Sequence, residues 1–223
     1  MARKMSIGMG VAALLCIGLS QNSQASVVSI GLFDTGVDSS GVALTGGDGV
    51  TDPHYTVLNS TIGATVGANA VTYLNPAYVP DSAGSRWISN SSDGNPGNGV
   101  VTFTTSFDLT GFNPATATIT GRWGVDNIGE IFLNGHDTSI GLPYGYPAFE
   151  ALHPFGITGG FLAGINTLSF EVTDTGPPLA LRVDELSANI TATPLPAALP
   201  LFVTGLGVMG LLARRRKQKK LEA

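Results

Sequence analysis

Segment 101–107, Val-Thr-Phe-Thr-Thr-Ser-Phe, alternates between apolar and polar residues, and this alternation constrains the fold more than any other feature of the chain. In an extended strand successive side chains point to opposite faces, so Val101, Phe103 and Phe107 would share one face. Segment 116–122 repeats the pattern, and no helical period appears between the two chain ends. The sequence therefore predicts an all-β sandwich or barrel.

Turn-forming residues separate the β-rich segments. Glycine adopts positive φ at little cost and Asn or Asp can bond its own backbone, so segments 46–49, 93–99 and 134–135 are expected to be turns. The composition agrees, because the body of the chain is rich in Gly, Thr, Val and Ser and poor in Lys, Glu and Gln. The expected strands are 27–33, 55–58, 70–74, 99–109, 115–123, 130–133, 167–173 and 180–190.

The N-terminal segment has the three parts of a secretory signal peptide. Arg3 and Lys4 precede the apolar residues 7–19, and Ser-Gln-Ala at 23–25 places small residues where a signal peptidase reads the chain. We predict a signal peptide over 1–25, with an N-terminal helix, cleaved between Ala25 and Ser26. The only cysteine, Cys16, would leave with it, so the mature body would contain no disulfide.

The C-terminal segment 194–220 also has three parts. A Pro-Leu-Pro motif is followed by the apolar run 197–213, about 17 residues, at the lower edge of the length that spans a bilayer as a helix. The basic cluster 214–220 comes next and would hold that end in the cytoplasm. The sequence thus predicts a C-terminal transmembrane helix, with residues 26–193, roughly 168 in all, as one exported domain.

This tail resembles the PEP-CTERM sorting signal of Gram-negative bacteria. Leu195 stands where the name-giving glutamate would be, which makes the motif a Pro-Leu-Pro variant. The resemblance implies an inner-membrane intermediate, cleavage by an exosortase (a membrane-embedded cysteine transpeptidase), and a final place at the cell surface or in the extracellular matrix. The residues that carry it are Pro194, Leu195, Pro196, Arg214, Arg215, Arg216 and Lys217.

The charge of the predicted body narrows the range of partners. Between residues 26 and 193 there are three arginines, no lysine and 15 acidic residues, which gives a net charge of −12. So acidic a surface repels phosphate backbones, and nucleic acid is therefore excluded as a partner.

Three stretches of the body resemble galactose-binding-like domains. They are Asp-Pro-His-Tyr at 52–55, Trp-Gly-Val-Asp-Asn at 123–127 leading to Ile-Phe-Leu-Asn-Gly at 131–135, and Ala-Gly-Ile-Asn-Thr-Leu at 163–168 with Leu-Arg-Val at 181–183. The resemblance implies a single jelly-roll β-sandwich. In many relatives the loops at one end of the sandwich bind sugar, although a fold alone does not fix a function.

A sugar site would need an aromatic platform beside amide, carboxylate or guanidinium groups that bond hydroxyls. The aromatic candidates are Tyr55, Trp87, Tyr144 and Tyr146, and the polar candidates are Asp126 and Asn127, with Arg86, Glu150, His54 and His153 as further choices. The loop Tyr-Gly-Tyr-Pro at 144–147 is the best predicted platform. Trp123 is more typical of a core, and we favour a hairpin turn at 126–127 over a ligand contact.

Metal and catalytic signals are weak. Segments 34–38 and 48–52 offer acidic oxygens that would suit Ca²⁺, but neither fits an EF-hand loop, and acids that cap turns are the favoured interpretation. The three histidines have no zinc spacing. There is no Gly-x-Ser-x-Gly, no His-Glu-x-x-His and no cysteine in the body. We therefore predict no cofactor, no metal-ligating residue and no enzymatic activity.

Two functions of different class remain open for the body. One is a binding module for extracellular polysaccharide, and the other is a structural component of the surface or biofilm matrix without a specific ligand. An exposed aromatic-lined groove beside polar residues would favour the first, and uniformly polar loops the second. A hydrolase would instead need a clustered acid pair in a cleft.

Overall fold

The computed structural model describes residues 26–27, 30–95 and 97–193, and beyond them residues 202, 205–207, 209–210 and 214, which are helical. The predicted signal peptide, the sorting motif and most of the apolar tail lie outside the described residues. Within the described part of the chain, no helix is both long and apolar enough to cross a membrane.

The described residues form eleven strands, and every pairing between them is antiparallel. A 3-10 turn, η1 (Pro114–Thr116), precedes the sixth strand. The strands are β1 (Ser26–Val27), β2 (Thr51–Ser60), β3 (Asn69–Thr72), β4 (Ile88–Ser89), β5 (Gly99–Asp108), β6 (Thr118–Asp126), β7 (Ile128–Leu133), β8 (His136–Leu142), β9 (His153–Ile157), β10 (Ile165–Asp174) and β11 (Ala180–Ile190).

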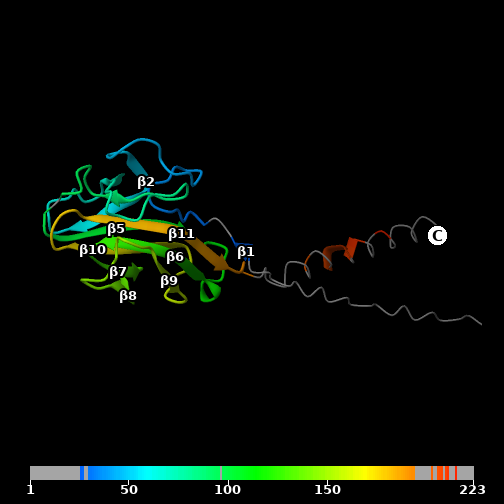
Figure 1. The fold of residues 1–223 in the computed structure, drawn as a ribbon. Helices are drawn as coiled ribbons and strands as arrows, with labels where there is room; N and C mark the ends of the chain where they lie inside the picture. The colour runs from blue at the N-terminus through cyan, green and yellow to red at the C-terminus, as the bar shows by residue number, and fades with distance from the viewer. Residues whose placement is uncertain are drawn as a thin grey trace, which may run out of the picture.

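The strands follow one another in the order β8-β7-β10-β5-β2-β3-β4-β11-β6-β9, with β1 added beside β11. The sheet folds over on itself, so that β6 lies against β7 and β10 as well as against its ladder partners (Figure 1). The result is an all-β sandwich of jelly-roll type with β8 and β9 as its two free edges. The prediction of an all-β sandwich is confirmed for the body of the chain.

The core lies between the two layers. The Trp123 ring of β6 packs against Phe170 of β10 with ring centroids 5.8 Å apart, and Phe155 of β9 meets the same Phe170 at 6.1 Å. The alternation predicted in β5 is also present, because Val101, Phe103 and Phe107 are all buried in this core. Trp123 is a core residue, as its sequence context predicted.

A buried arginine of β11 holds the loop between β3 and β4. Arg182 is 2% exposed; its Nε donates to Ser85 Oγ at 2.8 Å, and its Nη1 donates to the carbonyl oxygen of Pro80. Its Nη2 lies 3.3 Å from the Asp184 carboxylate. Because a buried charge is tolerated only when it is paired and hydrogen-bonded, these contacts explain why an arginine is found inside a β-sandwich.

The two ends of the described body lie together. Ser26 pairs with Ile190 and Val27 with Asn189, so β1 lies beside the C-terminal end of β11 (Figure 1). The other end of β11 is far away, because Ala180 pairs with Asp126 at the end of β6. A strand rises about 3.3 Å per residue, which makes β11 roughly 33 Å long.

The expected strand over 27–33 is wrong for its second half, since residues 30–34 lie outside any strand and Gly31 adopts φ 84°. The acids of segments 34–38 and 48–52 accept backbone N–H groups. Asp38 Oδ1 caps a turn by accepting the N–H groups of Ser40 and Val42, whereas Asp48 Oδ1 accepts that of the distant Leu74. Nowhere in the described residues do three His, Cys, Asp or Glu side chains converge as a metal site would require.

Candidate functional site

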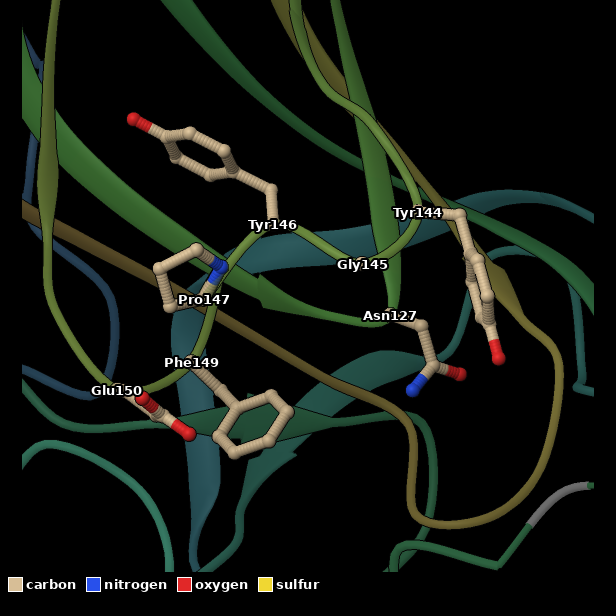
Figure 2. Close-up of a pocket in the computed structure, with 7 residues that line it drawn as sticks. All are labelled: Asn127, Tyr144, Gly145, Tyr146, Pro147, Phe149 and Glu150. Atoms are coloured by element: carbon tan, nitrogen blue, oxygen red, sulfur yellow. The ribbon is translucent and has the colours of Figure 1, made fainter.

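An open surface pocket of ≈ 450 Å³ lies where the loop between β8 and β9 passes the end of β6 (Figure 2). It contains three of the six residues that the sequence proposed for ligand binding. Its lining residues are Asn127, Tyr144, Gly145, Tyr146, Pro147, Phe149 and Glu150.

Backbone hydrogen bonds fix this loop against the sandwich. The Val125 N–H of β6 donates to the Ala148 carbonyl at 3.0 Å, and the Val79 N–H donates to the Phe149 carbonyl at 2.8 Å. Ala148 is fully buried. The loop therefore presents its aromatic residues from an anchored backbone, which lowers the entropy that a ligand must remove on binding.

Gly124 allows the loop to lie this close to β6. A Cβ added at position 124 would sit 2.7 Å from the Ala148 carbonyl oxygen and 2.9 Å from the ring of Trp87. Real Cβ atoms do not approach a backbone oxygen so closely. The Trp-Gly-Val-Asp-Asn motif at 123–127 thus combines a core tryptophan, a glycine under the pocket loop and an asparagine in the pocket.

Tyr144 and Asn127 form the part of the pocket suited to a polar ring. Tyr144 is 72% exposed, and its side chain lies beside that of Asn127 on the same side of the loop (Figure 2). The Asn127 amide is held in place: Oδ1 accepts the Thr175 N–H at 2.9 Å, and Nδ2 donates to Asp126 Oδ1. One N–H of Asn127 remains for a ligand hydroxyl.

Tyr146 has a different position from Tyr144. Its ring points away from Tyr144 and Asn127 (Figure 2). The ring packs on His153 with centroids 4.6 Å apart, and Tyr146 is 46% exposed. Tyr146 therefore contributes backbone to the pocket but no stacking surface beside Asn127.

Tyr55 and Trp87 are not ligand platforms, which corrects the prediction. Both are buried, Tyr55 at 0% and Trp87 at 1% exposure. The Tyr55 hydroxyl donates to the Phe33 carbonyl at 2.9 Å, and the Trp87 Nε1 donates to the Val79 carbonyl at 2.8 Å. Each ring lies in the interior, and its single polar group is hydrogen-bonded to a backbone carbonyl, so no glycan can stack on either ring.

Asp126 is also buried, at 3% exposure, and does not line the pocket. The Tyr78 hydroxyl donates to its Oδ2 at 2.7 Å. Burial, with the nearby charge of Asp174 adding to it, raises the pKa of Asp126 to about 6. Asp126 therefore holds the Asn127 amide through a hydrogen bond and cannot itself contact a glycan, which corrects its predicted role.

The hairpin turn predicted at 126–127 is wrong as well. β6 pairs with β11 and β9, whereas β7 pairs with β10 and β8. Residue 127 is therefore the point where the chain crosses from one layer of the sandwich to the other. The real hairpin joins β7 to β8 at Asn134 and Gly135, which adopt φ 54° and 78°.

Sequence reasoning missed Phe149, Tyr78 and Asp174. Phe149 packs against Tyr78 with ring centroids 5.4 Å apart, and so connects the pocket to a small aromatic cluster around Trp87. No local motif marks these positions, which come from three separate stretches of the chain. Only the strand order brings them to one end of the sandwich.

No family model matches the chain, and no curated protein matches it. Several solved structures resemble part of the chain, three of them as follows. A Stig cyclase, Fisc, from Fischerella sp. TAU is 12% identical with a TM-score of 0.44, over 77% of this chain and 100% of that one. The CBM36-1 domain of a multidomain xylanase from the hindgut metagenome of Trinervitermes trinervoides is 16% identical with a TM-score of 0.26. The match covers 44% of this chain and 76% of that one. CBM35 from Paenibacillus barcinonensis is 17% identical with a TM-score of 0.31. The match covers 61% of this chain and 98% of that one. The body distantly resembles these carbohydrate-binding modules and this Stig cyclase.

Proposed function

We propose that the body is a non-catalytic, galactose-binding-like module that holds extracellular polysaccharide in the pocket of Tyr144, Asn127 and Glu150. The observation that carries this proposal is the exposed Tyr144 ring beside a fixed amide in one pocket. Aromatic rings offer an apolar face to sugar C–H groups, and a few placed polar groups orient the hydroxyls.

A binding role fits this pocket better than hydrolysis. Glycosidases place two carboxyl groups against the scissile bond. Asp126, which precedes the lining residue Asn127, is 3% exposed and does not line the pocket. Glu150 is the only acid among the lining residues.

Charge favours neutral or amine-bearing glycans over uronic acids. No lining residue of the pocket is basic, and one, Glu150, is acidic. The three arginines of the body, Arg86, Arg122 and Arg182, each lie beside an acidic residue elsewhere. A carboxylated polymer would meet repulsion from the net charge of −12 between residues 26 and 193.

Tyr144→Ala is expected to weaken glycan binding at least about tenfold, since truncating an aromatic anchor removes about 2 kcal/mol or more. Tyr146→Ala, in the same loop, is the matched control, with an expected change of less than about threefold. The measurement is calorimetry on residues 26–193 with cellohexaose, a chitosan hexamer and oligogalacturonate, after a glycan array. Equal losses from both variants would contradict the site. No binding of any glycan class would favour the structural matrix component instead.

We also propose that the chain is exported, cleaved after Ala25 and sorted at its C-terminal tail by an exosortase to the cell surface or matrix. The support is the three-part tail and its order in the sequence. The pairing of β1 with the end of β11 is compatible with this route. The body begins and ends on the same side of the sandwich, so the two predicted cleavage points adjoin the same end of the body.

Replacing Pro194 and Pro196 together by alanine is expected to leave the protein uncleaved in the inner membrane of a host with an exosortase. Proline denies a helical hydrogen bond and keeps the preceding residue extended, which leaves backbone open to a protease. The control replaces residues 214–217 by neutral residues. This change should remove the basic cluster that holds the end of the tail in the cytoplasm, and it leaves the Pro-Leu-Pro motif unaltered. Mass spectrometry of released protein decides the matter, and an intact Ala223 on released wild-type protein would refute sorting.

A further inference from the structure

A buried tyrosine connects the aromatic side of the candidate pocket to its polar side. Tyr78 is 5% exposed and does not line the pocket, but its ring packs on Phe149 with centroids 5.4 Å apart. Its hydroxyl donates to Asp126 Oδ2 at 2.7 Å, and Asp126 Oδ1 accepts the Nδ2 group of Asn127. Phe149 and Asn127 both line the pocket, so one interior side chain acts on two of its walls.

The Asn127 amide can adopt only one orientation in these surroundings. Its oxygen, Oδ1, accepts the Thr175 N–H at 2.9 Å and the Thr175 hydroxyl at 3.0 Å. A backbone N–H can only donate, so the amide atom that faces Thr175 must be the oxygen. Turning the amide over would place its NH2 group against that donor and its oxygen against the Asp126 carboxylate. The side chain therefore directs Nδ2 toward Asp126 and has one N–H left for the pocket.

The Tyr78 hydroxyl keeps Asp126 in the position that this arrangement requires. Asp126 is 3% exposed, and its two oxygens accept from different parts of the chain, Oδ2 from Tyr78 and Oδ1 from Asn127. Without the hydroxyl, Oδ2 would be buried and unpaired, which is costly. The carboxylate would then turn to recover a donor, and the Asn127 amide would lose its fixed direction.

We propose that Tyr78 is a positioning residue of the pocket, which acts through Asp126 to fix the Asn127 amide with one N–H toward the ligand. This inference rests on the proposed glycan site and specifies the ligand group that the site accepts beside Asn127. That group must accept a hydrogen bond, as the oxygen of a sugar hydroxyl or of a sugar ring does. An ammonium group has only donors, so an amine-bearing glycan would have to direct its amine to the acceptor Glu150 instead.

The first test needs no glycan, because it observes the Asn127 side chain directly. In a ¹⁵N correlation spectrum of residues 26–193, the amide signals of Asn127 are identified by their loss in Asn127→Ala. The proton that Asp126 accepts should resonate apart from the other Nδ2 proton and exchange slowly with water. Tyr78→Phe keeps the ring on Phe149 but removes the hydroxyl. It should bring the two signals together and raise the exchange rate at least about threefold.

Tyr73→Phe is the matched control, since it removes a hydroxyl from the same aromatic cluster. The Tyr73 ring lies 6.1 Å from that of Tyr78, and its hydroxyl accepts the Asn75 amide at 3.4 Å rather than bonding Asp126. This variant should leave the Asn127 signals unchanged. Both variants retain their ring contacts, so both should fold, and dispersed backbone signals in the same spectra check this.

Calorimetry with cellohexaose then connects the arrangement to binding. Tyr78→Phe should raise Kd about three- to tenfold, because the amide must be ordered on binding, whereas Tyr73→Phe should change it less than about twofold. A wild-type protein that does not bind cellohexaose would count against the proposed glycan site, and the amide signals would still decide the role of Tyr78. Asn127 signals in Tyr78→Phe that match the wild type, or equal effects of the two variants, would overturn the inference.

Discussion

Arg182→Ala is expected to lower the free energy of unfolding by about 3–5 kcal/mol, because it breaks a buried charge network by removing one partner. Asp184 would lose its cation, and the carbonyl of Pro80 and the hydroxyl of Ser85 would lose their donor. Typical domains are stable by only about 5–15 kcal/mol. The variant should therefore be partly unfolded or should melt at a much lower temperature.

Arg122→Ala is the matched control, since Arg122 is the exposed arginine of the same sheet. Its side chain is 46% exposed and lies 3.9 Å from Glu185, and such surface pairs contribute less than about 1 kcal/mol. Urea titrations followed by fluorescence of the buried Trp87 and Trp123 would measure both variants. Similar losses from the two substitutions would show that the buried network contributes little.

The stability of the body is expected to fall as the pH rises from about 4 to 7. Burial raises the pKa of Asp34 to about 6, and the charges of Asp184 and Glu185 act in the same direction. Burial also raises the pKa of Asp52. A carboxyl group with a raised pKa favours the folded state while protonated. Its contribution is therefore complete below the unfolded value of 3.8 and is lost as the pH passes about 6.

Asp34→Asn should flatten this pH dependence. A rise from 3.8 to about 6 corresponds to at most about 3 kcal/mol, and the amide can still accept the Leu186 N–H that Asp34 Oδ1 accepts at 2.8 Å. Asp108→Asn is the control, because hydrogen bonds from Thr110 lower the pKa of this exposed acid. Thermal melts in the presence of a chelator test the prediction, and a wild-type optimum at neutral pH would contradict it.

Long strands buried on one face were predictable, whereas the edge strands and the two-residue β4 inside the sheet were not. β5 and β11 fall almost on their predicted ranges, 99–109 and 180–190, because core contact on one face demands apolar residues at alternate positions. β8 and β9 were missed. They are the free edges of the sheet, most of β8 is exposed, and β9 carries Pro154 at its second position, so neither needs a regular apolar pattern.

The candidate site was predictable only where turn-forming residues mark an exposed loop in the sequence. The Gly and Pro of segment 144–147 mark an exposed turn, and its tyrosines were named for that reason. Tyr55 and Trp87 resemble them in chemistry but lie in the interior, because an aromatic side chain suits a core as well as a binding surface. The contact between the Tyr78 hydroxyl and Asp126 depends on the strand order, which local sequence does not reveal.

The direction of β11 has a mechanical consequence. The pocket follows the end of β6 at Asp126, and the adjacent β11 ends at Ile190, at the opposite end of the same ladder. A polymer pulling on the pocket of a tethered molecule would draw these two antiparallel strands lengthwise past each other. Their ladder from Ala180 to Asn189 would then share the force among many hydrogen bonds at once, rather than opening one by one. If the body is tethered and binds polymer as proposed, this orientation of β6 and β11 would help it to resist drag.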